Sequence, residues 1–192
     1  MSVILQLVLV RHGETAWTVS GQHTGRTDLP LTAEGEAQAR ALRPRLAEMA
    51  FDAVLTSPLQ RARETCAFAG LRETALPDRD LVEWNYGDYE AKRSTDIRKT
   101  RPGWNLWRDG CPNGETAEDI AARADRVIAR LSQLRGNIVL FTHGQFAAAL
   151  AVRWIGLAVY QGQHFALGPA SLSGLTIDEA RPEPRLIVKW NT

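Results

Sequence analysis

The hydrophobic positions of the chain fall into short segments whose spacing predicts strands and helices. Residues 3–10 are rich in β-branched residues and leucine with almost no alternation, which is typical of a strand buried on both faces of a parallel sheet. Residues 53–56 and 138–141 repeat this pattern in shorter form. Residues 164–190 contain short alternating runs, which favour two or three closing strands.

Helical spacing fills the segments between the first strands. Thr32 caps a predicted helix over residues 33–49, in which leucine and methionine recur every three to four positions. Ser57 and Pro58 follow the second strand and indicate that another helix begins there, because serine caps helices and proline is favoured in the first turn. The order is therefore strand, helix, strand, helix.

Two more helices are predicted around the strand at residues 138–141. Thr116 and Asp119 form a capping-box pattern for a helix that runs to Leu134. Residues 146–155 form the last predicted helix. This alternation predicts an α/β fold of three layers, in which a mostly parallel central sheet carries helices on both faces.

One segment, at about residues 78–114, departs from this alternation. It is polar but rich in large aromatic side chains, namely Trp84, Tyr86, Tyr89, Trp104 and Trp107. We expect it to form a partly helical, lid-like insertion within a single domain that spans residues 1–192. The tryptophans are expected either to cover a ligand or to pack the insertion onto the domain.

The composition narrows the classes of partner. The 192 residues are 44% hydrophobic and 23% charged with a net charge of +1, so no overall field attracts nucleic acid or an anionic membrane. The first apolar run is too short to span a membrane and has no preceding basic region of the kind found in signal peptides. We expect a cytoplasmic protein and leave a homo-oligomer open.

Side chains suited to phosphate chemistry follow three of the predicted strands. Arg11 and His12 come directly after the first strand, Ser57 and Arg61 after the second, and His143 after residues 138–141. Because ligands of such sheets bind beyond the carboxyl ends of the strands, we expect these side chains to lie together. Arginine donates hydrogen bonds to phosphoryl oxygens in a planar fork. The set therefore indicates a phosphate site with a histidine nucleophile.

A metal site is the alternative chemistry for these histidines. His12 and His143 occur in no HxxH or HExxH arrangement and have no third ligand at a recognisable spacing. Cys66 and Cys111 show no CxxC spacing, which favours free thiols in a reducing compartment. We expect no metal and no cofactor. Arg63 is interpreted as a solvated helix residue.

Six motifs resemble the histidine phosphatase superfamily, also called the phosphoglycerate mutase-like family. They occur in the family's order: LVRHGET at 9–15, GRTDLPLT at 25–32, SPLQRARET at 57–65, EWNYGDY at 83–89, GET at 114–116 and THG at 142–144. The resemblance implies the phosphoglycerate mutase-like fold. It implies that His12 becomes phosphorylated, while Arg11, Arg61 and His143 hold the phosphoryl group. It also implies that Glu83 protonates the leaving oxygen and then activates water.

Elementary chemistry agrees with these roles. His12 has to be neutral to attack phosphorus, and we expect the arginines beside it to lower its pKa. Glu83 has to carry a proton to act as an acid, and we expect the aromatic residues after it to seclude it. Backbone N–H groups on the loop of Thr24 and Gly25 are expected to contact the phosphate.

Three stretches, at residues 20–32, 83–91 and 104–116, resemble the sedoheptulose-1,7-bisphosphatase branch of the family. The likeness implies that the partner is a small phosphorylated sugar or a related metabolite. The residues expected to contact it are His23, Thr24, Gly25, Ser57, Tyr86 and Arg108. Arg108 is expected to bind a second, distal phosphate.

Other functions are compatible with the same motifs. A phosphoglycerate mutase is disfavoured because Thr18 stands where mutases place asparagine, and because the stretch between Glu83 and His143 is shorter than theirs. An α-ribazole phosphatase stays open. A phosphohistidine protein phosphatase usually lacks the glutamate and the insertion. A binding module that only senses a phosphorylated ligand is disfavoured because all five catalytic candidates are present.

Overall fold

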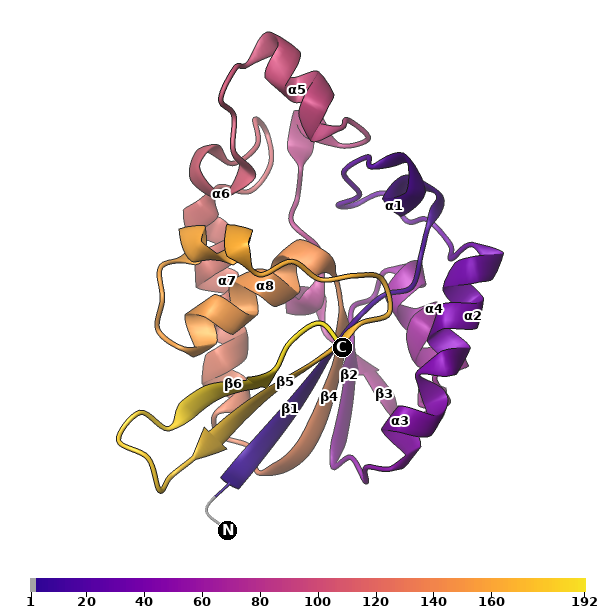
Figure 1. The fold of residues 1–192 in the computed structure, drawn as a ribbon, viewed down its shortest axis with the longest axis vertical. Coiled ribbons are helices and arrows are strands. Elements are labelled where there is room, and N and C mark those ends of the chain that lie inside the picture. Colours follow the sequence, from indigo (N-terminus) through magenta and orange to yellow (C-terminus); the bar gives the residue numbers. More distant parts are fainter. Residues whose placement is uncertain (1–2) are drawn as a thin grey trace.

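The strands of the protein form one mixed sheet in the computed structural model, which describes residues 3–192. Within that range the sheet has six strands in the order β3-β2-β4-β1-β5-β6 (Figure 1). The strands are β1 (Val3–Arg11), β2 (Ala53–Thr56), β3 (Ala75–Pro77), β4 (Gly136–Thr142), β5 (Leu172–Asp178) and β6 (Arg185–Lys189). The neighbours from β3 to β1 pair in parallel, whereas β5 is antiparallel to β1 and to β6. The predicted α/β class is confirmed, and the tail supplies two closing strands.

Both faces of the sheet are buried, which explains the continuous hydrophobic run of the first strand. Leu5, Leu7 and Leu9 belong to one hydrophobic cluster, and the intervening Val8 and Val10 belong to the other. Side chains of a strand point alternately to opposite faces, so a strand between two cores has few polar positions, and Gln6 is the one inside this run. The same division holds along β4.

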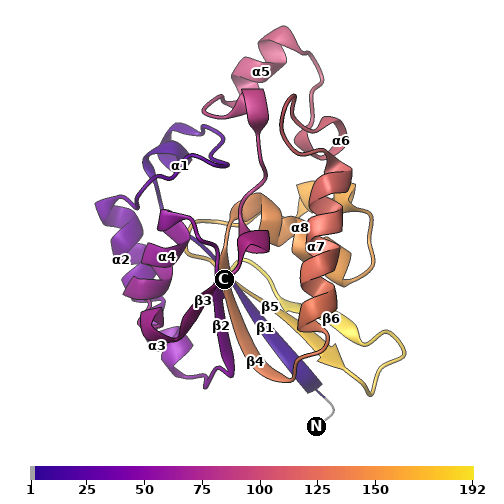
Figure 2. The same cartoon turned by 180° about the vertical axis from the view of Figure 1, so that it is seen from behind.

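Helices cover the two faces unequally (Figure 2). The first cluster is closed by α7 (Ala117–Leu131) and α8 (Gly144–Trp154), and the second by α2 (Ala33–Ala41), α3 (Arg43–Ala47) and α4 (Gln60–Phe68). The predicted capping box at the start of α7 is present in full. These layers are those predicted from the alternation of strands and helices.

Three predicted helix boundaries are wrong. The single helix predicted over residues 33–49 is divided at Leu42, because Pro44 has no N–H to continue the hydrogen-bond ladder of α2. The helix after Ser57 begins only at Gln60. Helix α7 ends at Leu131 rather than Leu134.

Residues 78–114 lie beyond the carboxyl ends of the parallel strands (Figure 1). They contain η2 (Arg79–Leu81), η3 (Gly87–Tyr89), α5 (Ser94–Thr100) and α6 (Leu106–Asp109). Trp104 and Trp107 are almost fully buried in the larger hydrophobic cluster, so they pack the insertion onto the domain. The short helix α1 (Ala16–Ser20) faces this insertion across the strand ends and was not predicted.

The remaining elements are η1 (Arg72–Thr74) and η4 (Val159–His164). Cys66 and Cys111 are free thiols, as predicted, and burial raises the pKa of each to about 12. Over residues 3–192, none of the helices has the length and apolar character required to cross a lipid bilayer. The cellular location and the oligomeric state stay predictions.

Candidate active site

Strand register brings the predicted site residues together. Arg11 is paired with Thr142 across β1 and β4, and Thr56 is paired with Phe141 across β2 and β4. His12, Ser57 and His143 are therefore the first residues beyond three adjacent strand ends. The rings of His12 and His143 lie edge to face, with 5.2 Å between their centroids.

The His12 ring is held in one tautomer. Its Nδ1 lies 2.7 Å from the carbonyl oxygen of Gly13, which can only accept, so Nδ1 carries the proton. The lone pair on Nε2 therefore faces the cavity described below. Burial, and then the charges of Arg61 and Arg11, lower the pKa of His12 well below its usual value. The imidazole is consequently neutral, as attack on phosphorus requires.

His143 is also neutral, and it is bonded through both nitrogens. Arg61 donates from Nε to Nδ1 of His143 at 3.2 Å, and a guanidinium can only donate, so the proton lies on Nε2. That Nε2–H donates to Oγ of Ser57 at 2.8 Å. Burial and the charge of Arg61 lower the pKa of His143 well below its usual value. Both ring nitrogens of His143 are therefore engaged by side chains of the protein.

Arg61 is fully buried and organises a loop. Besides His143, it donates to the carbonyl oxygens of Thr24, Gly25 and Thr27 at 3.0 to 3.1 Å. Arg61 and His143 do not line the cavity among the described residues; they lie behind His12. Their role in holding the phosphoryl group stays a prediction, and the charge of Arg61 lies close enough to His12 to lower its pKa.

Arg11 supplies the positive charge at the cavity itself. Its guanidinium donates to the carbonyl oxygen of Leu167, while its buried Nε has no hydrogen-bond partner within the described residues. A side chain on Gly144 would lie 3.3 Å from Arg11, so this glycine leaves the space the guanidinium occupies. An unpaired buried donor is costly, and an anion in the cavity would satisfy it.

Glu83 is held by backbone amides. Its Oε1 accepts from the N–H groups of Trp84 at 2.8 Å and Phe146 at 2.9 Å, and its Oε2 accepts from Gln145 at 3.0 Å. Two of these donors belong to the first turn of α8. Oε1 thus has both lone pairs engaged, whereas Oε2 keeps one. Oε2 is therefore the oxygen that can carry a transferred proton.

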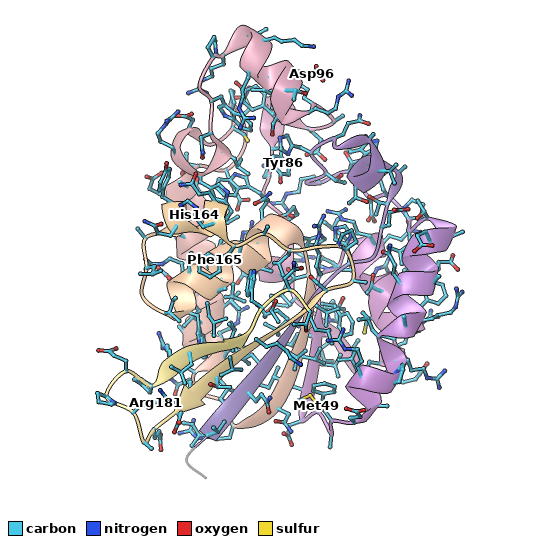
Figure 3. All side chains as sticks on the ribbon, viewed as in Figure 1. Met49, Tyr86, Asp96, His164, Phe165 and Arg181 are labelled. Atoms are coloured by element: carbon cyan, nitrogen blue, oxygen red, sulfur yellow. The ribbon has the colours of Figure 1, made fainter. Side chains whose placement is uncertain are left out.

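A cavity of about 320 Å³ joins these groups. Its lining includes Arg11, His12 and Glu83 on the sheet side, and His23, Thr24 and Tyr86 on the opposite side. His23 stacks on Tyr86 with 4.5 Å between ring centroids. Burial lowers the pKa of His23 to about 4, so this ring is neutral. In Figure 3, Tyr86 of the insertion lies between α6 and α1, and Phe165, the residue after η4, lies below it.

Two predicted contacts are not formed. The N–H of Gly25 donates to Oε1 of Glu90 at 2.8 Å and is not free for a phosphate. Arg108 forms a two-point ion pair with Asp109 and donates to the carbonyl oxygen of Gly103. It does not line the cavity among the described residues. The guanidinium that was predicted to bind a distal phosphate is therefore paired with the carboxylate of the next residue in the sequence.

Sequence reasoning missed the partners of Glu83. The predicted helix over residues 146–155 did not include Gln145, whereas α8 begins at Gly144, and the N–H groups at a helix N-terminus are well placed to bind an anion. Thr65 was also missed: its hydroxyl accepts from the N–H of Gly13 at 3.0 Å. The sequence feature that could have indicated Thr65 is the repeat of polar positions one helical turn apart in SPLQRARET.

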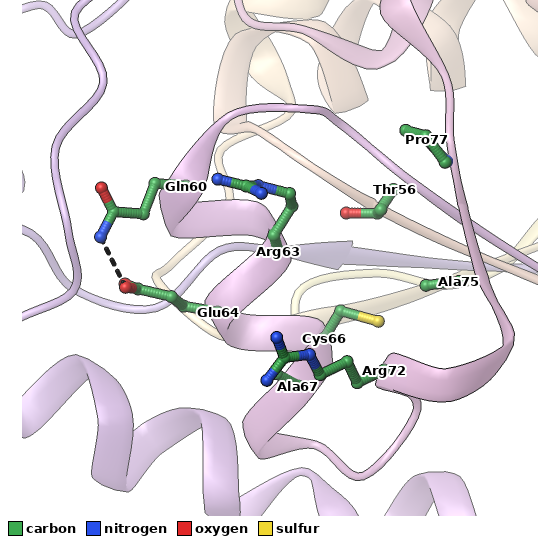
Figure 4. Close-up of a pocket in the computed structure, with 9 residues that line it drawn as sticks. All are labelled: Thr56, Gln60, Arg63, Glu64, Cys66, Ala67, Arg72, Ala75 and Pro77. Atoms are coloured by element: carbon green, nitrogen blue, oxygen red, sulfur yellow. Dashed lines mark hydrogen bonds between the residues drawn. The ribbon is translucent and has the colours of Figure 1, made fainter.

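A larger cavity, of about 410 Å³, lies elsewhere, between α4 and β3 (Figure 4). Arg63 and Arg72 line it, and Gln60 donates to Glu64 across its mouth at 2.7 Å. Arg63 is exposed, as predicted. No histidine lines this cavity, so it offers no nucleophile of the kind His12 provides. Over residues 3–192, no three His, Cys, Asp or Glu side chains are grouped as metal ligands would be.

The chain matches the model of the histidine phosphatase superfamily, branch 1, over residues 7–191 and therefore belongs to that superfamily. An acid phosphatase of Mycobacterium tuberculosis is 39% identical over 171 residues, which cover 87% of this chain and 84% of that protein. The sedoheptulose 1,7-bisphosphatase of Saccharomyces cerevisiae is 37% identical over 195 residues, which cover 82% and 70% of the two chains.

A solved structure has the same fold. The product of an open reading frame of Mycobacterium tuberculosis gives a TM-score of 0.90 at 35% sequence identity, and the match covers 97% of both chains. With the family and these relatives, the chain is a phosphatase, and phosphorylated small molecules fit as its substrates. The resemblance predicted from the motifs is confirmed.

Proposed function

We propose that the protein hydrolyses a phosphate monoester of a small sugar or related metabolite through a phosphohistidine at His12. The observation that carries this proposal is the fixed tautomer of His12, which presents the Nε2 lone pair to a cavity shared with Arg11 and Glu83. Phosphoryl transfer needs positioning and charge stabilisation more than covalent help from the protein.

The reaction has two steps. In the first, Nε2 of His12 attacks phosphorus, the ester P–O bond breaks, and the leaving oxygen takes a proton from Oε2 of Glu83. In the second, water attacks phosphorus, Glu83 takes a proton from that water, the N–P bond breaks and inorganic phosphate leaves. Arg11 and the buried Arg61 offset the negative charge that develops on the phosphoryl oxygens.

The substrate class is supported by a second cavity of about 260 Å³ that shares His23 and Gln145 with the first. Arg98 lines it and donates from Nε to the carbonyl oxygen of Trp104 at 3.0 Å. The terminal nitrogens of Arg98 have no hydrogen bond within the described residues. We assign the distal phosphate of a bisphosphorylated sugar, such as sedoheptulose 1,7-bisphosphate, to Arg98 instead of Arg108.

A mutase stays the second enzymatic candidate. Thr18 lines the main cavity, but its hydroxyl is engaged with the backbone of Thr15 in the capping box of α1. We expect water to accept the phosphoryl group, with little interconversion of 2- and 3-phosphoglycerate. An α-ribazole phosphatase is distinguished by including that nucleotide in a substrate panel.

The central experiment traps the intermediate. The protein is mixed briefly with a radiolabelled sugar phosphate, quenched in alkali, and tested for an acid-labile phosphate on His12, with a chelator present throughout. We expect labelling in the wild type, none in His12→Ala, and an unchanged rate in the chelator, because arginines take the place of metal ligands. Labelling that persists in His12→Ala, or activity that needs an added divalent metal, would contradict the proposal.

A further inference from the structure

Glu83 lies in a segment without regular secondary structure, and hydrogen bonds from other parts of the chain hold several of the backbone groups around it. Residues 82–86 connect η2 to η3 and have no strand neighbour. The carbonyl oxygen of Leu81 accepts from the hydroxyl of Thr142, and that of Asn85 accepts from the N–H of Glu115. The carbonyl oxygens of Asp80, Val82 and Glu83 are bound by one side chain from α7.

That side chain is Arg123, which is only 5% exposed. Its Nη1 donates to the carbonyl oxygens of Asp80 and Val82 at 2.9 and 2.6 Å, and its Nη2 donates to that of Glu83 at 3.2 Å. Nε and Nη2 also donate to the two carboxylate oxygens of Glu115 at 2.9 and 2.8 Å. All five N–H groups of the guanidinium are therefore engaged.

Glu115 completes the arrangement from the other side. Its Oε2 accepts from the N–H of Asn85 at 2.7 Å, and its backbone carbonyl accepts from the indole of Trp84 at 2.9 Å. Trp84 is in turn one of the three amides that hold the Glu83 carboxylate. We call the ion pair of Arg123 and Glu115, with these backbone bonds, the Arg123–Glu115 clamp.

The clamp also reaches the helix that holds the carboxylate. The guanidinium of Arg123 stacks over the ring of Phe146 at 4.4 Å, and the N–H of Phe146 donates to Oε1 of Glu83. Arg123 therefore contacts the main chain of Glu83 and the residue that binds its side chain. A shift of Arg123 would move the carboxylate relative to α8 and hence relative to His12.

We propose that Arg123 and Glu115 are positioning residues for proton transfer, and that the clamp keeps Oε2 of Glu83 at the leaving oxygen. The inference rests on the proposed function, in which Glu83 is the proton donor. Neither residue lines the cavity among the described residues, so the clamp acts through Glu83 and does not contact substrate.

The test is the dependence of kcat/KM on the leaving group, because kcat/KM includes every step up to departure of that group. A good leaving group such as 4-nitrophenolate needs no proton, whereas an alkoxide does. Arg123→Lys keeps the charge but loses the planar fork to Glu115. We expect kcat/KM for an alkyl phosphate to fall about 30-fold, which is part of the roughly 100-fold or larger contribution of general acid catalysis, and that for 4-nitrophenyl phosphate to fall less than about 3-fold.

Three further variants sharpen the test. Glu83→Gln should show the same selective loss at larger size, and adding Arg123→Lys to it should cause no further loss. Glu115→Gln changes the clamp without removing its volume and should act as Arg123→Lys does. Arg130→Lys, on the same helix but exposed and paired with Asp78 and Asp80, is the matched control and should leave the leaving-group dependence unchanged.

The outcomes separate the two proposals. Equal losses for both esters in Arg123→Lys and Glu115→Gln, measured below the temperature at which each begins to unfold, would overturn the clamp as a positioning device. A wild type that hydrolyses esters without labelling His12 would instead overturn the proposed function.

Discussion

At the scale of single residues, hydrogen bonds decide what each charged or titratable group can do. His12 presents Nε2 because Gly13 accepts from Nδ1. Arg108 is paired with Asp109, whereas the terminal nitrogens of Arg98 have no hydrogen bond beside the substrate cavity. Two arginines that look alike in the sequence therefore have different chemistry.

This difference gives a paired prediction for substrate choice. Arg98→Gln should lower kcat/KM for a bisphosphorylated sugar about 10-fold, the equivalent of one charge-assisted hydrogen bond of roughly 1.5 kcal/mol, and should spare the matching monophosphate. Arg108→Gln should change neither value by more than about 2-fold. A loss of the preference in Arg108→Gln alone would restore the assignment made from the sequence.

At the scale of elements, close packing between α2 and the first strand end holds the nucleophile loop. A side chain on Gly35 would lie 2.1 Å from the carbonyl oxygen of Glu14, and one on Gly13 would lie 2.5 Å from that of Gly35. Thr32, which caps α2, donates from its N–H to the same Glu14 carbonyl. The first turn of α2 thus fixes the loop whose Gly13 carbonyl orients His12.

Gly35→Ala should therefore disturb both stability and catalysis. We expect a loss of about 1–3 kcal/mol in the free energy of unfolding, because backbone has to move to admit a methyl group, together with a lower kcat/KM. Urea unfolding and an ester assay measure the two effects. Gly168→Ala is the control, since its methyl group would meet only Asn191 at 3.6 Å. Equal stability of the two variants would show that the backbone of α2 moves to admit the methyl group at little cost in free energy.

At the scale of the whole molecule, the buried site makes stability depend on pH. His12, His143 and His23 all have folded-state pKa values below the ordinary value of about 6.5. At pH values between the lowered folded-state pKa and the ordinary pKa of each histidine, the unfolded chain binds more protons than the folded one. The free energy of unfolding therefore falls as the pH falls below about 6.5. The effect is separate from that of the carboxylates, whose ordinary pKa values lie near 4.

The contribution of His23 can be isolated. For one histidine with a folded pKa of about 4, the free energy of unfolding should fall by at most about 1.4 kcal/mol per pH unit between pH 6 and 5. In His23→Gln this slope should decrease by about that amount, as measured by urea unfolding at each pH. The exposed His164→Gln serves as control. An unchanged slope in His23→Gln would mean that folding does not lower the pKa of His23.

Several features of the fold could be predicted because they depend on local pattern. Residues 138–141 are apolar at every position and residues 3–10 at every position but Gln6, a pattern typical of a strand between two cores. The capping box at Thr116 and Asp119 is a contact between residues three apart. The break at Leu42 was missed because the hydrophobic spacing on both sides of Pro44 favoured one continuous helix.

The amino-acid sequence by itself determined the α/β layers, the family and the identity of the residues gathered at the strand ends, since these follow from periodicity and motif order. Only the tertiary structure decided which of those groups face the cavity. Arg61 and His143 are buried and bonded to each other, Arg108 is paired with Asp109, and Glu83 is bound by the amides of α8. In each case several partners were possible for the same donor or acceptor. The partner that the fold places within hydrogen-bonding distance forms the bond, and the sequence alone does not show those distances.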